Sequence, residues 1–231
     1  MRHLLRVVGR RVAPVVGACV LLAGGIGACV LGDAAPAQAT ACAGAVVAGT
    51  ACTDTGTLTF TAGTLTLTSP TALAWAGTGN GLNQQLVDPT TAQQAYVVND
   101  ATGSGAGWNV TVSATTFTST SPAATLANTG TFSTNGSITG QALTTAPTAA
   151  CTGSNTCTVP TDTTVYPVAI TTATSAPTAV KIYDASAATG LGSITIGYPG
   201  AAAVGWWVAV PANAVPATYT SIVTLEVITA P

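Results

Sequence analysis

The sequence is short of charged side chains and of the residue types that most often carry catalysis. Its 231 residues include one histidine, five Lys or Arg and seven Asp or Glu. His3 and four of the bases lie in the first eleven residues, so Lys181 is the only base beyond them. Binding to nucleic acid requires several Lys or Arg that displace counterions from the phosphates. The sequence therefore predicts no nucleic-acid partner.

The lack of histidine also restricts catalysis and metal binding. Beyond residue 11 there is neither histidine nor arginine, which excludes Ser-His-Asp and Cys-His arrangements there. A pair of carboxylates could serve a glycosidase, but the acids are scattered and form no recognisable motif. Asp100, beside a run of glycines, is expected to cap a turn by accepting backbone N–H bonds. We predict no enzyme, no cofactor and no metal site.

The N-terminus has the three parts of a secretory signal peptide. Residues 2–11 carry four arginines, residues 12–31 form an apolar run, and Ala37-Gln38-Ala39 is a small-x-small cleavage site. Pro14 and several glycines make the run a poor membrane anchor. We expect cleavage after about Ala39, which leaves a secreted chain with one base, six acids and no transmembrane anchor.

Four cysteines follow the predicted signal peptide. An even number of cysteines in an exported chain favours disulfides, and four cysteines allow three pairings. We favour Cys42–Cys52 and Cys151–Cys157, because each pair closes a short loop rich in small residues. A metal site is the weaker alternative, since no histidine is present to complete it. Such short loops pin local hairpins more than they stabilise a whole domain.

Short β-strands account for most of the remaining pattern. The clearest alternation of apolar and polar residues covers residues 57–61 (Thr-Leu-Thr-Phe-Thr) and 64–68 (Thr-Leu-Thr-Leu-Thr). No amphipathic helix is predicted after the signal peptide. Further strands are expected at residues 73–76, 93–100, 108–114, 129–132, 137–143, 165–170, 180–183, 193–198, 206–210 and 218–228. Strands of this length and spacing indicate an all-β fold, a β-sandwich of short antiparallel strands of Ig-like or Greek-key type.

The predicted organisation has three parts. Residues 1–39 are the signal peptide, residues 40–56 a short leader pinned by the first disulfide, and residues 57–231 a single sandwich domain. Within that domain, residues 144–164 are low in complexity, contain two prolines and carry the second cysteine pair. This stretch is expected to be a surface insertion.

A family resemblance is carried by residues 100–112, Asp-Ala-Thr-Gly-Ser-Gly-Ala-Gly-Trp-Asn-Val-Thr-Val. They resemble the first signature of the WxL-domain surface proteins of Gram-positive bacteria, in which an Asp, a glycine-rich crossing and Gly-Trp-x-Leu follow in order. Residues 216–227 are similar in layout to the second signature, a Tyr, an alternating run and Trp-x-Leu. Val110 stands where the first signature has Leu, and Leu225 and Val227 stand where the second has Trp and Leu. The chain resembles a divergent member, and its Ala, Thr and Gly usage suggests an actinobacterial host.

The resemblance implies a non-catalytic surface protein that binds peptidoglycan or another cell-wall glycan without a covalent link. It also implies other surface proteins as partners. The candidates for contact with the wall are Trp108, Val110, Trp206, Trp207 and Tyr219. The residues that support the motifs are Asp100, Gly103, Gly105, Gly107, Leu225 and Val227.

The aromatic candidates have two interpretations. A tryptophan at the start of a strand belongs to the core more often than to a ligand platform, so both roles stay open for Trp108. Trp206 and Trp207 should point to opposite faces of their strand, and we expect one of them to be more exposed. The alternative function is a structural subunit of a fimbrial or coat-like surface assembly, joined through sheet edges.

Overall fold

The computed structural model describes residues 40–41, 48–49, 51–126, 132–135 (backbone only), 146–198 and 203–229. The chain divides into two compact units, residues 1–58 and 59–231. In the first unit β1 (Thr40–Ala41) pairs in parallel with β2 (Cys52–Thr53). The signal peptide predicted at residues 1–39 lies outside the described residues. No helix within the described part of the chain is long and apolar enough to cross a membrane.

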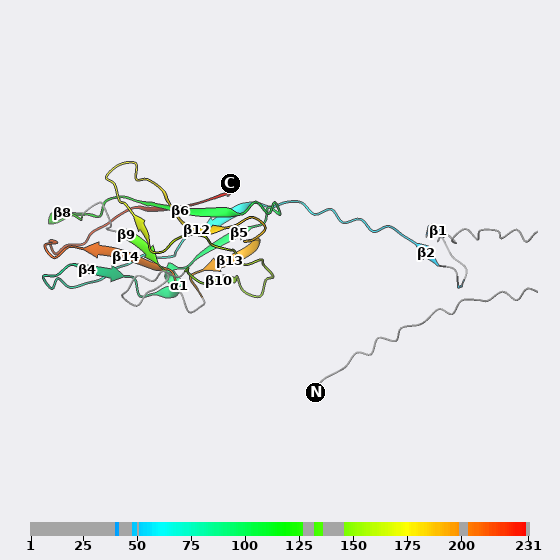
Figure 1. Ribbon diagram of the computed structural model, residues 1–231, viewed down its shortest axis with the longest axis horizontal. Helices are drawn as coiled ribbons and strands as arrows, with labels where there is room; N and C mark the ends of the chain where they lie inside the picture. The colour runs from blue at the N-terminus through cyan, green and yellow to red at the C-terminus, as the bar shows by residue number, and fades with distance from the viewer. Residues whose placement is uncertain are drawn as a thin grey trace, which may run out of the picture. The chain divides into compact units, whose positions relative to one another are not determined.

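The second unit is built from antiparallel strands arranged in layers (Figure 1). The hydrogen-bonded orders are β10-β13-β5-β3, β11-β9-β14-β4 and β12-β6-β15, with a small β7-β8 hairpin beside them. A single four-residue helix, α1 (Thr91–Gln94), precedes β5. The strands are β3 (Leu65–Thr68), β4 (Gln84–Val87), β5 (Tyr96–Asp100), β6 (Trp108–Ala114), β7 (Thr118–Thr120), β8 (Ala123–Thr125), β9 (Phe132–Asn135), β10 (Ala149–Cys151), β11 (Val168–Ile170), β12 (Val180–Ala185), β13 (Gly192–Ile196), β14 (Gly205–Val210) and β15 (Val223–Thr229). The predicted all-β class is confirmed.

Strand β6 supplies the centre of the hydrophobic core. Every second residue, Trp108, Val110, Val112 and Ala114, is completely buried, while the residues between them are partly exposed. This is the alternation that a strand with one face on a core requires, because successive side chains point to opposite faces. β6 lies between β12 and β15, and all its pairings are antiparallel. The core continues into β5, β13 and β14.

The strongest strand pattern in the sequence is only half realised. Residues 64–68 contain β3, which pairs with β5. Residues 57–61 form no strand, and the side chains of Leu58 and Phe60 are 90% and 89% exposed. The strand predicted at residues 73–76 is also wrong, because the chain there is irregular. Alternation of apolar and polar residues indicates which face a strand would bury. It does not guarantee that a partner strand lies beside it.

Several elements had weak signals or none. β4 carries two glutamines and lies in a stretch for which no strand was predicted. Residues 144–164 contribute β10, which pairs with β13. The Cys151–Cys157 disulfide is present, with a Cα–Cα distance of 5.5 Å. Cys42 lies outside the described residues, so its pairing with Cys52 stays a prediction. The strands predicted at residues 129–132 and 137–143 lie outside the described residues except for Phe132, which begins β9.

Candidate functional site

The glycine-rich crossing between β5 and β6 is held by Asp100. Its carboxylate Oδ1 accepts hydrogen bonds from the backbone N–H and the hydroxyl of Thr102, at 3.0 and 2.6 Å. Gly103, Gly105 and Gly107 then adopt φ values of 66°, 65° and 81°, in the left-handed region that side chains disfavour. The expected turn-capping role of Asp100 matches this geometry, and three of the crossing's glycines are required by backbone conformation.

Gly107 lets the chain pass close to the backbone after β12, and Gly190 makes room for the Trp108 indole. A Cβ on Gly107 would lie 2.2 Å from the carbonyl oxygen of Ala185, and a Cβ on Gly190 would lie 2.6 Å from Trp108 Nε1. The indole N–H donates to the Gly190 carbonyl at 2.8 Å, and its ring stacks on Tyr183 at 6.1 Å between centroids. Trp108 is therefore an anchor of the interior, with its only polar atom satisfied by backbone.

The two motifs of the sequence lie side by side on neighbouring strands. β15 pairs with β6 so that Leu225 lies opposite Val112 and Val227 lies opposite Val110. Directly opposed residues of antiparallel strands share a face, so both motifs contribute to the same layer of the core. Leu225 and Val227 are half-buried, whereas their partners on β6 are fully buried.

Four of the five predicted wall-contact residues are interior. Trp108 and Val110 are completely buried, and so is Trp206, whose indole N–H donates to the Gln94 carbonyl at 3.0 Å. The expectation that one of the two adjacent tryptophans is exposed is wrong, because Trp206 and Trp207 are 0% and 2% exposed. They do point to opposite faces of β14, but both faces of this strand are covered. None of these four can touch a wall polymer in this structure.

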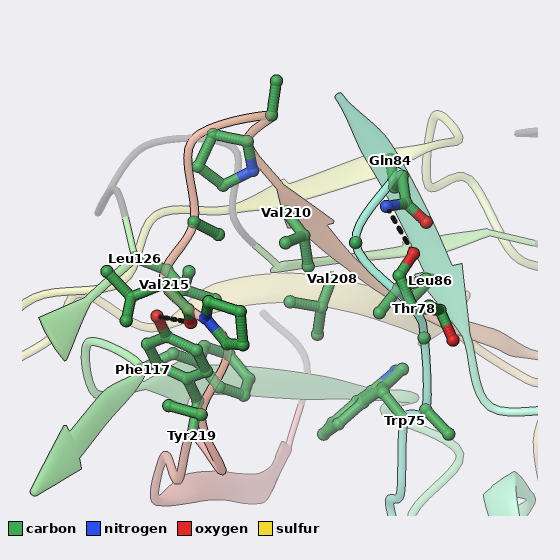
Figure 2. Close-up of a pocket in the computed structure, with 18 of the residues that line it drawn as sticks. Trp75, Thr78, Gln84, Leu86, Phe117, Leu126, Val208, Val210, Val215 and Tyr219 are labelled. Atoms are coloured by element: carbon green, nitrogen blue, oxygen red, sulfur yellow. Dashed lines mark hydrogen bonds between the residues drawn. The ribbon is translucent and has the colours of Figure 1, made fainter. Parts of the chain in front are cut away.

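Tyr219 is the exception, because it lines a cavity of about 410 Å³. This Tyr219 cavity is formed by the loop after Trp75, by β4 and β14, and by the loop that follows β14. Trp75 and Phe117 meet edge to face in it, with centroids 5.7 Å apart, and Figure 2 shows Tyr219 close to Phe117. The Tyr219 hydroxyl donates to the Val215 carbonyl at 2.7 Å and so fastens its own loop.

The lining of the Tyr219 cavity is neutral. Its apolar members include Leu86, Leu126, Val208, Val210, Pro211 and Pro216. Its polar members include Thr78, Asn80, Gln84 and Thr218, and none of the described residues that line it is charged. The Gln84 amide donates to the Thr78 carbonyl at 3.0 Å, which joins β4 to the preceding loop (Figure 2). An apolar floor with a few amides and hydroxyls suits an uncharged ligand.

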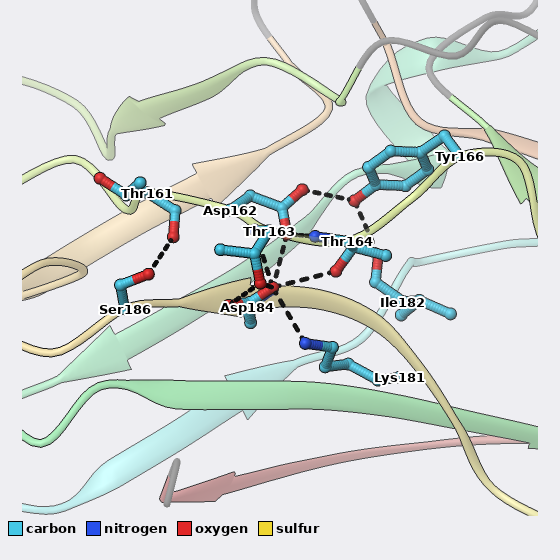
Figure 3. A network of polar contacts seen from close by, with 9 residues as sticks. All are labelled: Thr161, Asp162, Thr163, Thr164, Tyr166, Lys181, Ile182, Asp184 and Ser186. Atoms are coloured by element: carbon cyan, nitrogen blue, oxygen red, sulfur yellow. Dashed lines mark hydrogen bonds and ion pairs between the residues drawn. The ribbon is translucent and has the colours of Figure 1, made fainter.

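A second cluster of polar side chains joins the 161–166 segment to β12 (Figure 3). Asp162 Oδ1 accepts the backbone N–H groups of Thr164 and Asp184, at 3.1 and 3.0 Å. Asp184 accepts the N–H of Thr163 at 2.9 Å and the ammonium of Lys181 at 3.3 Å. The only base beyond residue 11 is thus committed to an ion pair within the fold.

The two carboxyls of this cluster have opposite proton affinities. Burial raises the pKa of Asp162, and hydrogen bonds from Tyr166 and Thr164 only partly offset that effect. Burial also acts to raise the pKa of Asp184, but the hydrogen bonds from Thr163, Asp162 and Lys181 outweigh it and leave the pKa lowered. Asp184 is therefore the ionised member of the pair, and Asp162 the member that retains a proton to higher pH.

This carboxyl pair serves structure in the geometry observed. Every carboxyl oxygen of the pair already bonds a backbone N–H, a hydroxyl or the Lys181 ammonium. The pair lies outside the Tyr219 cavity. No group of three or more potential metal ligands occurs among the described residues. Asp162 and Asp184 are twenty-two positions apart in the sequence, and the fold brings them together. Their contacts hold the 161–166 segment against β12.

Sequence reasoning missed Trp75 and Phe117 as site residues. Both lie in irregular segments of the chain, and neither lies in the motifs around Trp108 or Leu225. The available signal was composition, because aromatics are only 5% of this chain and three of them meet in one cavity. Only the fold brings Trp75, Phe117 and Tyr219 together from three distant segments.

These features define an all-β sandwich domain with a neutral, aromatic-lined cavity, a type of domain suited to binding. Residues 51–231 match the family model described as WxL domain surface cell wall-binding. The match covers most of the sequence, so the chain belongs to the WxL family, and it is a cell-surface, wall-associated protein. Neither the curated proteins nor the solved structures contain a significant match to this chain.

Proposed function

We propose that this protein attaches non-covalently to the cell wall by binding the glycan of peptidoglycan in the Tyr219 cavity, and that it catalyses no reaction. The observation that carries the proposal is the cavity itself, which combines three aromatic rings with amides and hydroxyls and has no charged lining residue. Its volume of about 410 Å³ falls within the usual range for ligand sites, roughly 300–1,000 Å³.

The chemistry of the wall favours its glycan over its peptide stems as the ligand. Amino sugars of the glycan present neutral hydroxyls, amides and apolar ring faces, which match the lining of the cavity. Stem peptides carry carboxylates and amines, and burying these without a partner is costly. The only base beyond residue 11, Lys181, is paired with Asp184 and does not line the cavity.

Export and retention complete the proposal. Residues 1–39 act as a signal peptide removed after about Ala39, residues 40–56 form a leader, and residues 57–231 form the binding domain. Retention at the surface then rests on the wall glycan, and other surface proteins are additional partners. The family resemblance and the composition support a Gram-positive, actinobacterial host.

The proposal is tested by sedimentation of the exported protein with purified peptidoglycan. We expect Tyr219→Ala to weaken binding at least tenfold, which corresponds to about 1.4 kcal/mol. Tyr219→Phe keeps the ring and removes only the hydroxyl bond to Val215, so it should bind nearly as well as wild type. Tyr198→Ala is the matched control, because Tyr198 is exposed and lies outside the cavity.

Four outcomes would contradict parts of the proposal. Folded wild type that does not sediment with peptidoglycan removes wall binding altogether. Equal binding by wild type and Tyr219→Ala places the site elsewhere on the protein. Competition by free stem peptides, rather than by glycan chains stripped of peptides, reverses the ligand assignment. Release of soluble fragments from the wall by wild type would overturn the non-catalytic role.

A further inference from the structure

The segment of residues 57–61 is built like a strand but lacks a partner strand among the described residues. Figure 1 draws it as an extended trace without a strand arrow. Leu58 and Phe60 are two residues apart, so in an extended chain they share one face. They are also the two most exposed large hydrophobic side chains described, at 90% and 89%. Two large apolar groups that share a face and reach full solvent exposure indicate a surface that a partner covers.

The segment cannot fold back on β3 through a tight hairpin. Gly63 donates its N–H to the Ala101 carbonyl at 2.8 Å, and Ala101 donates to the Thr64 carbonyl at 3.3 Å. A two-residue hairpin turn between residues 57–61 and β3 would require Ala62 and Gly63 to lie outside the β-ladder. The hydrogen bond from Gly63 to Ala101 instead extends the β3–β5 ladder to Gly63. The chain is therefore held extended from β3 back to Gly63, which leaves no two-residue turn between residues 57–61 and β3.

A matching acceptor lies at the edge of the β12-β6-β15 sheet. In the described structure β15 pairs with β6 alone, which leaves the N–H and C=O groups of its outer edge without a strand. The core-side residues Val223, Leu225 and Val227 are only half-buried, whereas Val110 and Val112 of β6 are completely buried. The apolar face of the sheet thus extends to an edge strand that the described residues cover only in part.

The facing sheet ends at the same place. β15 contacts β3, the edge strand of the β10-β13-β5-β3 sheet. Leu65 and Leu67 of β3 are also half-buried. Together the two edges form a seam of five half-buried aliphatic side chains. The only charge on either strand is that of Glu226, which is exposed, and neither strand carries the lysine or proline that commonly protects a sheet edge.

We propose that residues 57–61 of one copy add as a strand to the outer edge of β15 in a second copy. Leu58 and Phe60 then cover the seam, and the threonines between them face solvent. The segment has no charge, so it meets Glu226 without repulsion. Each copy carries both the strand and the acceptor edge, so the contact is head-to-tail, and it can propagate into a chain of copies unless it closes.

The test is the molar mass of the exported protein as a function of concentration, measured by analytical ultracentrifugation. Wild type is expected to associate. Thr59→Pro removes one backbone donor and keeps both apolar side chains, and Leu58→Asp with Phe60→Asp removes the apolar contact. Each variant should weaken association at least tenfold. Neither should change the urea midpoint, because residues 57–61 form no ladder in the described fold.

Val165→Asp is the control, because Val165 is 85% exposed and receives the same apolar-to-acid change away from the segment. It should associate like wild type. A wild type that remains monomeric at every concentration overturns the proposal. Association that survives both Thr59→Pro and the double aspartate variant also overturns it, since another surface must then be responsible. Binding to peptidoglycan by a monomeric variant is unaffected by either result.

Discussion

Replacing Asp162 by asparagine should leave the protein about as stable as wild type, or more stable, at neutral pH. The reason is the number of protons that are available for hydrogen bonds around the Tyr166 hydroxyl. Its hydroxyl lies 2.8 Å from Asp162 Oδ2 and 2.8 Å from the Ile182 carbonyl oxygen. The hydroxyl has one proton and the carbonyl can only accept. Both contacts become full hydrogen bonds if Asp162 is protonated and donates to Tyr166, while Tyr166 donates to Ile182.

The magnitude follows from counting the hydrogen bonds of Asp162. Its carboxyl bonds the N–H of Thr164, the N–H of Asp184 and the hydroxyl of Tyr166. Each is worth about 1 kcal/mol net, so Asp162→Ala should cost about 3 kcal/mol. An asparagine side chain at this position retains an oxygen for the two N–H groups and offers an N–H to Tyr166, as a protonated Asp does. Asp162→Asn should therefore cost less than about 1 kcal/mol.

The pH dependence gives a second, independent check. The pKa of Asp162 is raised by burial above its ordinary value of 3.8, so the folded state binds the proton more tightly than the unfolded state. This contribution to stability is complete below 3.8 and is lost as pH rises through the folded pKa. Asparagine does not titrate. The stability of Asp162→Asn relative to wild type should therefore increase with pH across that interval.

The assay is urea denaturation of wild type, Asp162→Asn and Asp162→Ala at a series of pH values. The pKa of Asp184 is lowered in wild type, partly by its hydrogen bond with Asp162, so the proteins are compared above pH 3.8, where Asp184 is already ionised. If Asp162→Asn is as unstable as Asp162→Ala at neutral pH, the negative charge of Asp162 is needed for stability. A difference from wild type that does not change with pH would refute the proton assignment.

Two further changes test the interior. Gly107→Ala should destabilise the fold by about 3 kcal/mol or more in urea denaturation, because its Cβ would lie 2.2 Å from the Ala185 carbonyl oxygen. Gly103→Ala, with a similar φ and no atom within 4 Å, should cost only about 1 kcal/mol, and equal losses would contradict the steric argument. Replacing Cys151 and Cys157 by serine should cost about 2 kcal/mol by the loop-entropy estimate, and an unchanged midpoint would show that β10 is held by its ladder alone.

The fold was predictable where local pattern and core burial coincide. β6 was expected at residues 108–114 and ends where predicted, because its alternation of buried and half-buried residues is visible in the sequence. The same rule failed at residues 57–61, where the alternation is equally clear and no strand covers it. β4 was not predicted, because its sequence Gln-Gln-Leu-Val does not alternate between apolar and polar residues. The strand forms by pairing with β14. Pairing is a long-range property that a local pattern does not contain.

The site was less predictable than the fold. Among the predicted wall-contact residues, Tyr219 is the one that lines the cavity, and it was selected for its place in a motif. Trp75 and Phe117 carry no motif and are separated from Tyr219 by more than a hundred residues. The Asp162–Asp184 pair was likewise not foreseeable, because a contact across twenty-two residues, from the Asp184 N–H to the Asp162 carboxylate, joins them. Sites assembled from distant loops depend on topology, which spacing along the chain does not report.

The two motifs contribute chiefly to the core, and the second also supplies Tyr219 to the candidate wall-binding cavity. The Trp108 indole packs against Gly190 and Tyr183, and Leu225 pairs with Val112 on the neighbouring strand. Both motifs therefore specify the packing of β6 against its neighbours. Leu225, which stands where the second signature has a tryptophan, is a half-buried core-side residue of β15 and does not line the Tyr219 cavity. Wall binding should then depend on the surface that the motifs hold in place, of which the Tyr219 cavity is the aromatic part.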